Sequence, residues 1–245
     1  MRDGPLKRFL LSGLFSAQEV ARALGQAAGP AGFHGQTIDY EAYWRHRGAG
    51  GVHPRFLIIA RGVGDGESVL DVGCGNGAFL GYLKSTRPVR ERGVDVSATG
   101  VALARAAGLD ARVGLLGAPG TVDAGELFDH VVLTEVIEHV ADAEGLLRQV
   151  WSHTRRSLWV TFPNIAYFPH RWRLALGRFP VQWVVFPGEH LRFWSVPDFR
   201  EWAVGVGLPL PVTLPSNGIV FGNLHRVWPN LLANQVVMRF DRPAA

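Results

Sequence analysis

The middle of the chain alternates short apolar runs with segments of helical periodicity. Five apolar runs have the length of buried strands, namely residues 68–72, 92–96, 111–116, 128–134 and 157–162. Apolar residues at helical spacing mark the segments between them, namely residues 78–84, 99–107 and 142–153. The run Val131-Val132-Leu133 is apolar on both faces, which is typical of a central parallel strand covered by helices on both sides. The alternation predicts a doubly wound α/β sheet.

The N-terminal part has a different pattern. Three helices are predicted before the first strand, at residues 5–28, 38–48 and 54–62. The first carries a loose apolar stripe and ends at a Gly-Pro-Ala-Gly sequence. We therefore interpret residues 1–50 as an N-terminal helical segment or lid, and residues 51–245 as one domain.

The rhythm changes again after the fifth strand. Residues 163–187 are rich in Trp, Arg, Phe and Pro. We expect an insertion at about 163–194 that caps the carboxyl edge of the sheet. Beyond it the pattern predicts one helix and two final strands, at residues 196–204, 208–214 and 234–240.

The composition narrows the class of protein. With 245 residues, 47% of them hydrophobic and 19% charged, the chain can bury a full core. No apolar run approaches the ~20 residues of a membrane span, so we expect no membrane association. Cys74 is the only cysteine and the first residues lack a signal-peptide layout, which favours the cytoplasm. The net charge of +4 is not gathered in a dense basic run, so nucleic-acid binding is not expected either.

The first predicted strand runs into a glycine-rich loop that opens a helix. Gly73, Gly75 and Gly77 follow the strand at two-residue spacing. Glycine permits a tight turn and lets backbone N–H groups approach a ligand closely. Asp95 ends the second strand, where a carboxylate can accept both hydroxyls of a ribose. A dinucleotide fingerprint would space its glycines as G-x-G-x-x-G, so the spacing here argues against a dinucleotide.

The stretch Val69-Leu70-Asp71-Val72-Gly73-Cys74-Gly75-Asn76-Gly77 resembles motif I of the class I S-adenosylmethionine-dependent methyltransferases. The resemblance implies a Rossmann-like methyltransferase sheet, S-adenosylmethionine as cofactor, and Asp95 as the ribose-binding carboxylate. The implied cofactor-binding residues are Asp71, Gly73, Cys74, Gly75, Gly77, Asp95, Val96 and Thr134. That family often has an aspartate after the third strand, where this chain reads Val113-Gly114-Leu115-Leu116-Gly117, so no side chain is assigned to the adenine amine.

A second group of polar residues ends the fourth strand. Glu135, Glu138 and His139 have i, i+3, i+4 spacing, which on a helical turn places two carboxylates and an imidazole on one face. The turn lies where open α/β sheets bind ligands. These side chains can coordinate a divalent cation, or serve as a general base with an orienting acid. In a third interpretation His139 packs against the sheet and the glutamates are solvated.

This turn, together with Gly188-Glu189-His190-Leu191-Arg192-Phe193-Trp194-Ser195, is similar to sequences in two methyltransferase groups. One group is the ubiquinone-biosynthesis O-methyltransferases. The other is the small-RNA 3′-terminal 2′-O-methyltransferases, which hold adjacent hydroxyls with a divalent metal. The resemblance implies Mg²⁺ or another divalent cation on four ligands, namely Glu135, Glu138, His139 and His190. Without a metal, His139 or His190 is the expected catalytic base, with Glu138 beside it.

Four later segments are similar, in order, to the W-type proteins of methionine biosynthesis, a methyltransferase-fold group linked to homoserine acylation. The segments are 162–165, 170–174, 177–181 and 230–235. That group does not usually carry the E-x-x-E-H turn. The chain therefore resembles a relative with competent active-site chemistry.

The cap also supplies candidate acceptor-binding residues, because guanidinium groups bind anions and aromatic faces bind rings. The candidates are Arg171, Arg173, Arg192, Trp172, Trp183 and Trp194, with Tyr43 from the N-terminal segment. The acceptor would then be anionic or aromatic. Alternatively, the tryptophans form the cap's own core. Likewise, Tyr40, Tyr43 and Trp44 either close over the cofactor or pack against the domain.

These features lead to a small-molecule O-methyltransferase as the expected function. One alternative is an RNA terminal 2′-O-methyltransferase, which would need an RNA-binding surface that the charge pattern does not indicate. Another is a non-catalytic protein that keeps the methyltransferase fold and binds a partner in a biosynthetic pathway. The sequence leaves the identity of the acceptor, the binding of a metal and the formation of a homodimer open.

Overall fold

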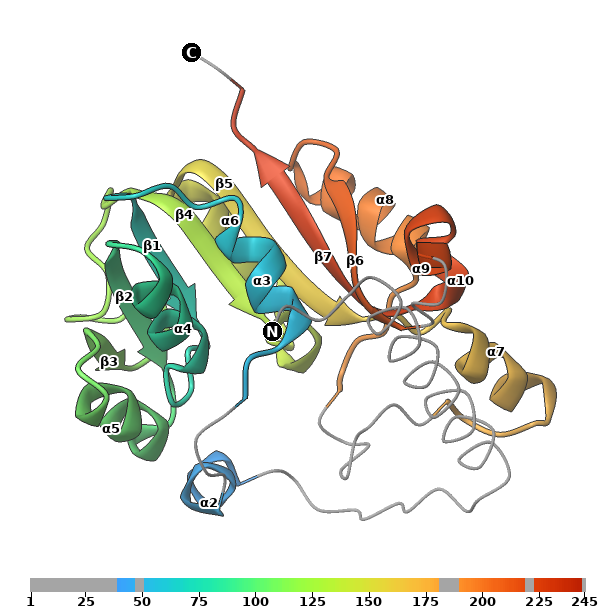
Figure 1. Cartoon of the computed structure of the whole chain (residues 1–245), viewed down its shortest axis with the longest axis horizontal. Helices are drawn as coiled ribbons and strands as arrows, with labels where there is room; N and C mark the ends of the chain where they lie inside the picture. Colours follow the sequence, from blue (N-terminus) through green and yellow to red (C-terminus); the bar gives the residue numbers. More distant parts are fainter. Residues whose placement is uncertain (1–38, 47–50, 181–189, 219–222, 244–245) are drawn as a thin grey trace, which may run out of the picture.

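The computed structural model describes residues 39–46, 51–180, 190–218 and 223–243. It contains a seven-stranded sheet in the order β3-β2-β1-β4-β5-β7-β6 (Figure 1). β1 to β5 are parallel, and β7 runs antiparallel between β5 and β6. The strands are β1 (Ser68–Val72), β2 (Arg90–Asp95), β3 (Ala111–Val113), β4 (Phe128–Thr134), β5 (Thr154–Pro163), β6 (Val212–Gly218) and β7 (Ala233–Asp241).

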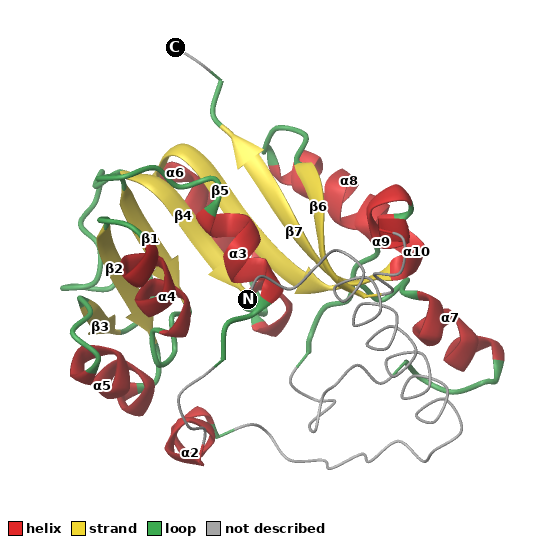
Figure 2. Cartoon of the chain, in the orientation of Figure 1, coloured by secondary structure: helices red, strands yellow, loops and turns green. Residues whose placement is uncertain are grey.

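Helices connect the parallel strands and flank the sheet (Figure 2). The helices are α2 (Tyr40–His46), α3 (Pro54–Ala60), α4 (Ala78–Thr86), α5 (Ala98–Ala106), α6 (Ala143–Ser152), α7 (Phe168–Ala175), α8 (Val196–Val206), α9 (Leu224–Val227) and α10 (Pro229–Leu232). A short 3-10 helix, Ile137–His139, follows β4. The predicted doubly wound α/β fold is therefore confirmed, with the addition of one antiparallel strand.

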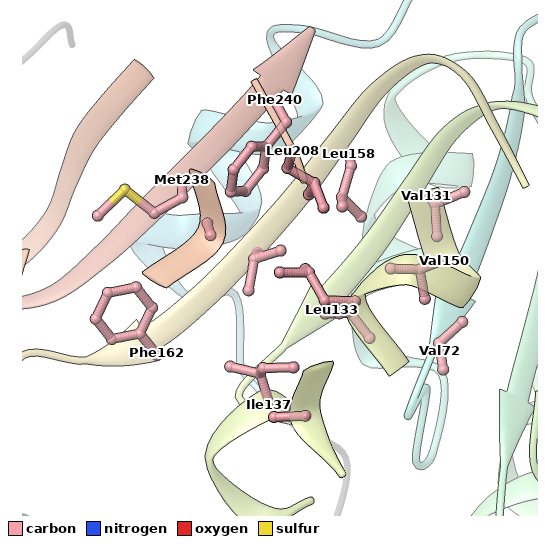
Figure 3. Close-up of a cluster of buried hydrophobic side chains, with 14 of the residues drawn as sticks. Val72, Val131, Leu133, Ile137, Val150, Leu158, Phe162, Leu208, Met238 and Phe240 are labelled. Atoms are coloured by element: carbon pink, nitrogen blue, oxygen red, sulfur yellow. The ribbon is translucent and has the colours of Figure 1, made fainter. Parts of the chain in front are cut away.

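The two faces of the sheet bury separate hydrophobic clusters. Val131 and Leu133 belong to the cluster that α6 and α8 complete, whereas Val132 belongs to the cluster that α3, α4 and α5 complete. Figure 3 shows the first cluster, in which Leu133 lies between Ile137 and Leu158. Burying a side chain of this size stabilises the fold by about 1.5–3 kcal/mol. Because its side chains are apolar on both faces, β4 packs into both clusters as a central strand.

Several predicted boundaries were wrong. The third strand ends at Val113, and not at residue 116, because Gly114 has a φ of 143° and turns the chain. The sixth strand covers Val212–Gly218, and not residues 208–214. Leu208 follows the left-handed Gly207 that ends α8, and its N–H donates to the Ala203 carbonyl, so this apolar residue packs in the core as part of a helix cap.

Other predictions fall on residues that are not described. The helix expected at 5–28 and Trp183 both lie outside the described ranges, as do parts of the segments assigned to the lid and the cap. Across the part of the chain that the structure describes, none of the helices has the length and apolar character needed to cross a membrane.

Candidate active site

The glycine-rich loop joins β1 to α4 at the carboxyl edge of the parallel strands. Gly73, Gly75 and Gly77 have φ values of 80°, 53° and 75°, a left-handed conformation that favours glycine. A Cβ at Gly73 would overlap Val136, and one at Gly77 would overlap Leu109. Glycine at these positions therefore lets Val136 and Leu109 pack directly against the loop backbone.

Asp95 at the end of β2 holds the loop in place. Its Oδ2 accepts a hydrogen bond from the Gly75 N–H at 2.7 Å, and its Oδ1 accepts one from the Ser97 N–H at 2.8 Å. Burial raises the pKa of Asp95, and the nearby carboxylate of Glu41 adds to this effect. The predicted ribose-binding carboxylate thus lies directly beside the middle glycine of the loop.

Asp71, in β1 beneath the loop, is almost fully buried, and its Oδ1 accepts no hydrogen bond from protein. Burial raises the pKa of Asp71 to about 8; Asp95 adds to the shift and Arg55 opposes it. Arg55, in α3, donates from Nη1 to Oε1 of Gln235 in β7 at 3.2 Å, while its Nε has no partner. No motif in the sequence marks Arg55 as a residue of this site.

The other predicted cofactor residues surround the same loop. Cys74 is buried, and burial raises the pKa of its thiol. Val96, which follows Asp95, is 53% exposed, so its side chain is available to a ligand. Thr134 is the partly buried last residue of β4, on the next strand of the sheet. All of these residues lie at the carboxyl edge of the parallel strands.

Helix α2 covers the glycine-rich loop from the N-terminal side. The carboxylate of Glu41 accepts hydrogen bonds from the backbone N–H groups of Ala98 and Thr99, at 2.7 and 2.9 Å, in the first turn of α5. Hydrogen bonds from Thr99 lower the pKa of Glu41 to about 2. A Cβ at Gly75 would overlap the indole of Trp44, which packs edge-on against the ring of Tyr43. Trp44 therefore lies on the loop itself.

Glu135, directly after β4, does not lie on the predicted helical turn. Its φ is 56°, and the 3-10 helix begins only at Ile137. The Glu135 N–H donates to Oγ1 of Thr161 at 3.0 Å, and the Thr161 hydroxyl donates to Oε1 of Glu135 at 2.7 Å. Because Thr161 of β5 holds Glu135 in this way, the prediction that Glu135, Glu138 and His139 share one face of a helical turn is wrong.

Glu138, His139 and His190 nevertheless gather into one group. One potential ligand atom from each residue lies within 4.8 Å of the others. The imidazole rings of His139 and His190 have centroids 4.7 Å apart, and Nε2 of His139 is 3.9 Å from Oε1 of Glu138. The N–H groups of Leu191 and Arg192 donate to the Glu138 carbonyl, which brings His190 to the turn.

Burial controls the electrostatics of this group. Glu138 is 1% exposed and neither carboxylate oxygen accepts a hydrogen bond from protein. Burial, with the charge of Glu135 adding, raises the pKa of Glu138 well above its ordinary value. Burial also lowers the pKa of His190 to about 4, with a contribution from His139. A buried carboxylate without partners is costly unless a ligand or cation satisfies it.

The predicted acceptor-binding arginines hold the fold together. Arg171 donates to the Ala166 carbonyl at 2.5 Å, and Arg173 donates to the Phe179 carbonyl at 2.6 Å. Arg192 donates to Oε1 of Glu144 at 2.6 Å and to the Ala141 carbonyl at 2.7 Å. These guanidinium groups therefore stabilise the backbone of the segments around the Glu138, His139 and His190 group.

The tryptophans of the cap divide between the core and the surface. Trp194 is buried among aromatic rings, 5.9 Å from Phe162 and 5.5 Å from Phe199 between ring centroids, as the core-forming interpretation expected. Trp172, in α7, is 46% exposed.

The family model of the methionine biosynthesis protein MetW matches residues 53–240. This chain belongs to the MetW family. A curated relative is the bifunctional methionine biosynthesis protein MetXA/MetW of Rhodopirellula baltica, 29% identical over 154 residues, which are 56% of this chain and 24% of that protein. A ubiquinone biosynthesis O-methyltransferase of Methylobacterium sp. is 33% identical over 119 residues, 47% of this chain and 45% of that protein. The match thus spans less than half of each of these curated relatives.

Solved structures with the same fold are methyltransferases. One is the methyltransferase in a complex with the Haloferax volcanii Trm112 activator, with a TM-score of 0.61, 18% identity and coverage of 85% of this MetW-family chain and 100% of that chain. Another is the magnesium protoporphyrin IX methyltransferase of Synechocystis PCC 6803 with bound SAH, with a TM-score of 0.55, 15% identity and coverage of 96% and 99%. The predicted methyltransferase fold and the W-type resemblance are both confirmed.

Proposed function

We propose that this MetW-family protein transfers a methyl group from S-adenosylmethionine to a hydroxyl of a small-molecule acceptor. The observation that carries the proposal is that the glycine-rich loop with Asp95 and the Glu138, His139 and His190 group lie at the same edge of the sheet. Methyl transfer needs a cofactor site and a hydroxyl-activating site close together, because the two reactants must approach in line.

The cofactor side fits S-adenosylmethionine. Three glycines in left-handed conformation form the tight turn of the loop, and the Asp95 carboxylate next to it can accept ribose hydroxyls. The buried Oδ1 of Asp71 still lacks a donor, which the cofactor's amino group would supply. Bound S-adenosylmethionine provides an electrophilic methyl group on a sulfonium.

The acceptor side fits a divalent cation. Glu138, His139 and His190 offer one carboxylate and two imidazoles, a donor set that suits transition metals such as Mn²⁺ or Zn²⁺ better than Mg²⁺. Glu135 lies beside them as a fourth candidate. A cation held there would lower the pKa of an acceptor hydroxyl and orient it. The hydroxyl oxygen would then form the new O–CH₃ bond while the S–CH₃ bond breaks, the electron pair of that bond would stay on sulfur, and the hydroxyl proton would pass to solvent.

Isothermal titration calorimetry with S-adenosylmethionine tests the cofactor half of the proposal. We expect saturable binding, and about 10- to 100-fold weaker binding for Asp95→Asn, because a charge-assisted hydrogen bond contributes roughly 1.5–3 kcal/mol. Absence of heat at millimolar cofactor would contradict the proposal.

Thermal unfolding with Mn²⁺ tests the metal half. A cation that binds only the folded protein raises the melting temperature. We expect this increase for the wild type and for Glu201→Gln, an exposed control on α8, and its loss in Glu138→Ala and His190→Ala. An equal increase in all four proteins would contradict metal binding by Glu138 and His190. Turnover that persists in EDTA would mean that the reaction needs no metal and that His139 or His190 is the catalytic base.

A second candidate function is that of a non-catalytic partner in a biosynthetic pathway. The observation that favours it is the match to one part of the bifunctional protein MetXA/MetW. Absence of S-adenosylmethionine binding in the calorimetric titration would support this second function.

A further inference from the structure

The residue that follows β4 has a backbone conformation that glutamate rarely adopts. Glu135 has a φ of 56°, and among the non-glycine residues that the structure describes only Asn223 also has a positive φ. Asparagine enters the left-handed region readily, whereas for most other side chains this conformation is uncommon and persists only where neighbouring groups impose it. The conformation of Glu135 is therefore set by its surroundings.

Thr161 of β5 is the group that imposes this conformation. Its side chain is fully buried, and it pairs with Thr134, the last residue of β4, in the sheet. The Thr161 hydroxyl accepts the Glu135 N–H at 3.0 Å and donates to Oε1 of Glu135 at 2.7 Å. The Thr161 carbonyl accepts the same N–H at 3.3 Å. One buried residue thus fixes both the direction of the chain after β4 and one carboxylate oxygen of Glu135.

The direction of the chain after Glu135 determines what packs on the glycine-rich loop. Val136 is the next residue, and its side chain occupies the space where Gly73 would have a Cβ. The Val136 carbonyl accepts the His139 N–H at 3.0 Å, so the turn that carries Glu138 and His139 starts from the same residue. Val136 therefore joins the glycine-rich loop to that turn.

The carboxylate of Glu135 lies near the other half of the site. Its charge contributes to the raised pKa of Glu138, and Glu135 is the fourth candidate ligand for a cation. A hydrogen bond that holds a candidate ligand in one orientation favours binding of the cation, and loss of such a partner typically costs about 10- to 100-fold in metal affinity. The Thr161 hydroxyl has this relation to Glu135.

We propose that Thr161 is a positioning residue of the active site, which acts through Glu135 and keeps the glycine-rich loop and the Glu138, His139 and His190 group in place relative to each other. This inference rests on the proposed function and adds a residue to it. Because Thr161 is fully buried, it acts on the ligands through Glu135 and not by direct contact.

Two binding measurements on Thr161→Val test the inference. Valine is close to threonine in size and favours strands, but it has no hydroxyl. We expect S-adenosylmethionine to bind at least about fivefold more weakly in calorimetry, the lower limit usual for coupling between two sites. Mn²⁺ should bind about 10- to 100-fold more weakly, as measured from the electron paramagnetic resonance signal of free Mn²⁺. Thr161→Ser keeps the hydroxyl and should bind both ligands like the wild type.

Thr154→Val is the matched control, because Thr154 is a buried threonine at the other end of β5 whose hydroxyl donates to the Val150 carbonyl at 2.7 Å. It should lower the melting temperature as Thr161→Val does and leave both affinities unchanged. If Thr161→Val does not fold, Thr161→Ala takes its place. Equal losses of affinity in the variants at 154 and 161, or unchanged affinities in the variant at 161, would mean that Thr161 supports only the fold, and would overturn the inference.

Glu135→Gly provides a second test, since glycine adopts a φ of 56° without support from a hydroxyl. On this background Thr161→Val should cause no further loss of S-adenosylmethionine affinity, because Thr161 acts through Glu135. A further loss as large as that in the single variant would show that Thr161 acts by another route, and the inference would be wrong. A wild type that binds neither ligand would overturn the proposed function itself, and this inference with it.

Discussion

Gly75, in the middle of the glycine-rich loop, contacts both Asp95 and Trp44. Its N–H donates to Asp95, its φ is 53°, and the indole of Trp44 occupies the place of a Cβ. Gly75→Ala should therefore weaken S-adenosylmethionine binding and lower the free energy of unfolding by about 1–3 kcal/mol, the usual cost of a residue in a sparsely populated conformation. Calorimetry and urea denaturation measure the two effects.

Gly81 offers a matched control for this substitution. It lies in α4, where a Cβ would meet no atom within 4 Å. Gly81→Ala should raise the free energy of unfolding by about 0.5–1 kcal/mol, because alanine loses less backbone entropy in a helix. Similar effects at both glycines would show that the loop geometry is not special.

Asp71 predicts a pH dependence of stability. Burial raises its pKa from 3.8 to about 8, so the folded state retains a proton that the unfolded chain releases near pH 4. The free energy of unfolding should then fall as the pH rises from about 4 to about 8, on the order of a few kcal/mol at about 1.4 kcal/mol per pKa unit.

Asp71→Asn removes this titration and should flatten the stability profile over that pH range. Urea denaturation at a series of pH values measures the change. Asp65→Asn, which alters an exposed carboxylate, should keep the slope of the wild type. A slope that is unchanged in Asp71→Asn would mean that other groups cause it.

At the scale of elements, α2 is a short helix that buries none of its residues, and its Glu41 and Trp44 contact α5 and the glycine-rich loop. Glu41 accepts the first N–H groups of α5, and Ser97 accepts the Gly100 N–H, so the start of α5 is satisfied in part from another element. Helix α2 thus depends on α5 for its position over the loop.

Glu41→Ala should release α2 and, with it, Trp44 from the glycine-rich loop. We expect weaker S-adenosylmethionine binding and a red-shifted tryptophan emission, with little change in melting temperature, because Glu41 is only partly buried. Glu201→Gln again serves as the control. Cofactor affinity equal to that of the wild type would show that α2 does not help to retain the cofactor.

The same comparison of elements explains what the sequence could predict. The β1 to β5 pattern and the glycine-rich loop were readable because they depend on local periodicity and on residues adjacent in the chain. The placement of Glu135 was not, because Thr161 of β5 sets its conformation from another strand. Arg55 and Glu41 were likewise hidden, since each acts on residues distant in sequence.

At the scale of the whole molecule, the two edges of the sheet have different tasks. The glycine-rich loop and the Glu138, His139 and His190 group lie at the carboxyl edge. At the opposite edge, the carboxylate of Glu67, directly before β1, lies 2.7 Å from Nε2 of His130 in β4 in a hydrogen bond and forms an ion pair with Arg156 of β5. The indole N–H of Trp159 donates to Nδ1 of His130. This network joins three strands without contacting the glycine-rich loop.

Glu67→Gln should separate stability from function. Losing a partly buried charged acceptor should lower the free energy of unfolding by about 1–3 kcal/mol, while S-adenosylmethionine affinity stays unchanged. Denaturation and calorimetry on one preparation provide both values. A parallel loss of cofactor affinity would mean that the two edges are coupled.

The antiparallel β7 has a consequence for the order of events during protein synthesis. β6 reaches the sheet only through β7, and β7 also supplies Gln235 to Arg55. While the ribosome is still translating residues before 233, the nascent chain can pair β1 to β5, but the exposed edge of β5 has no neighbour. Until β7 lies between β5 and β6, Gln235 is not in place to accept the hydrogen bond from Arg55, so this contact of the site can form only after translation has passed residue 235.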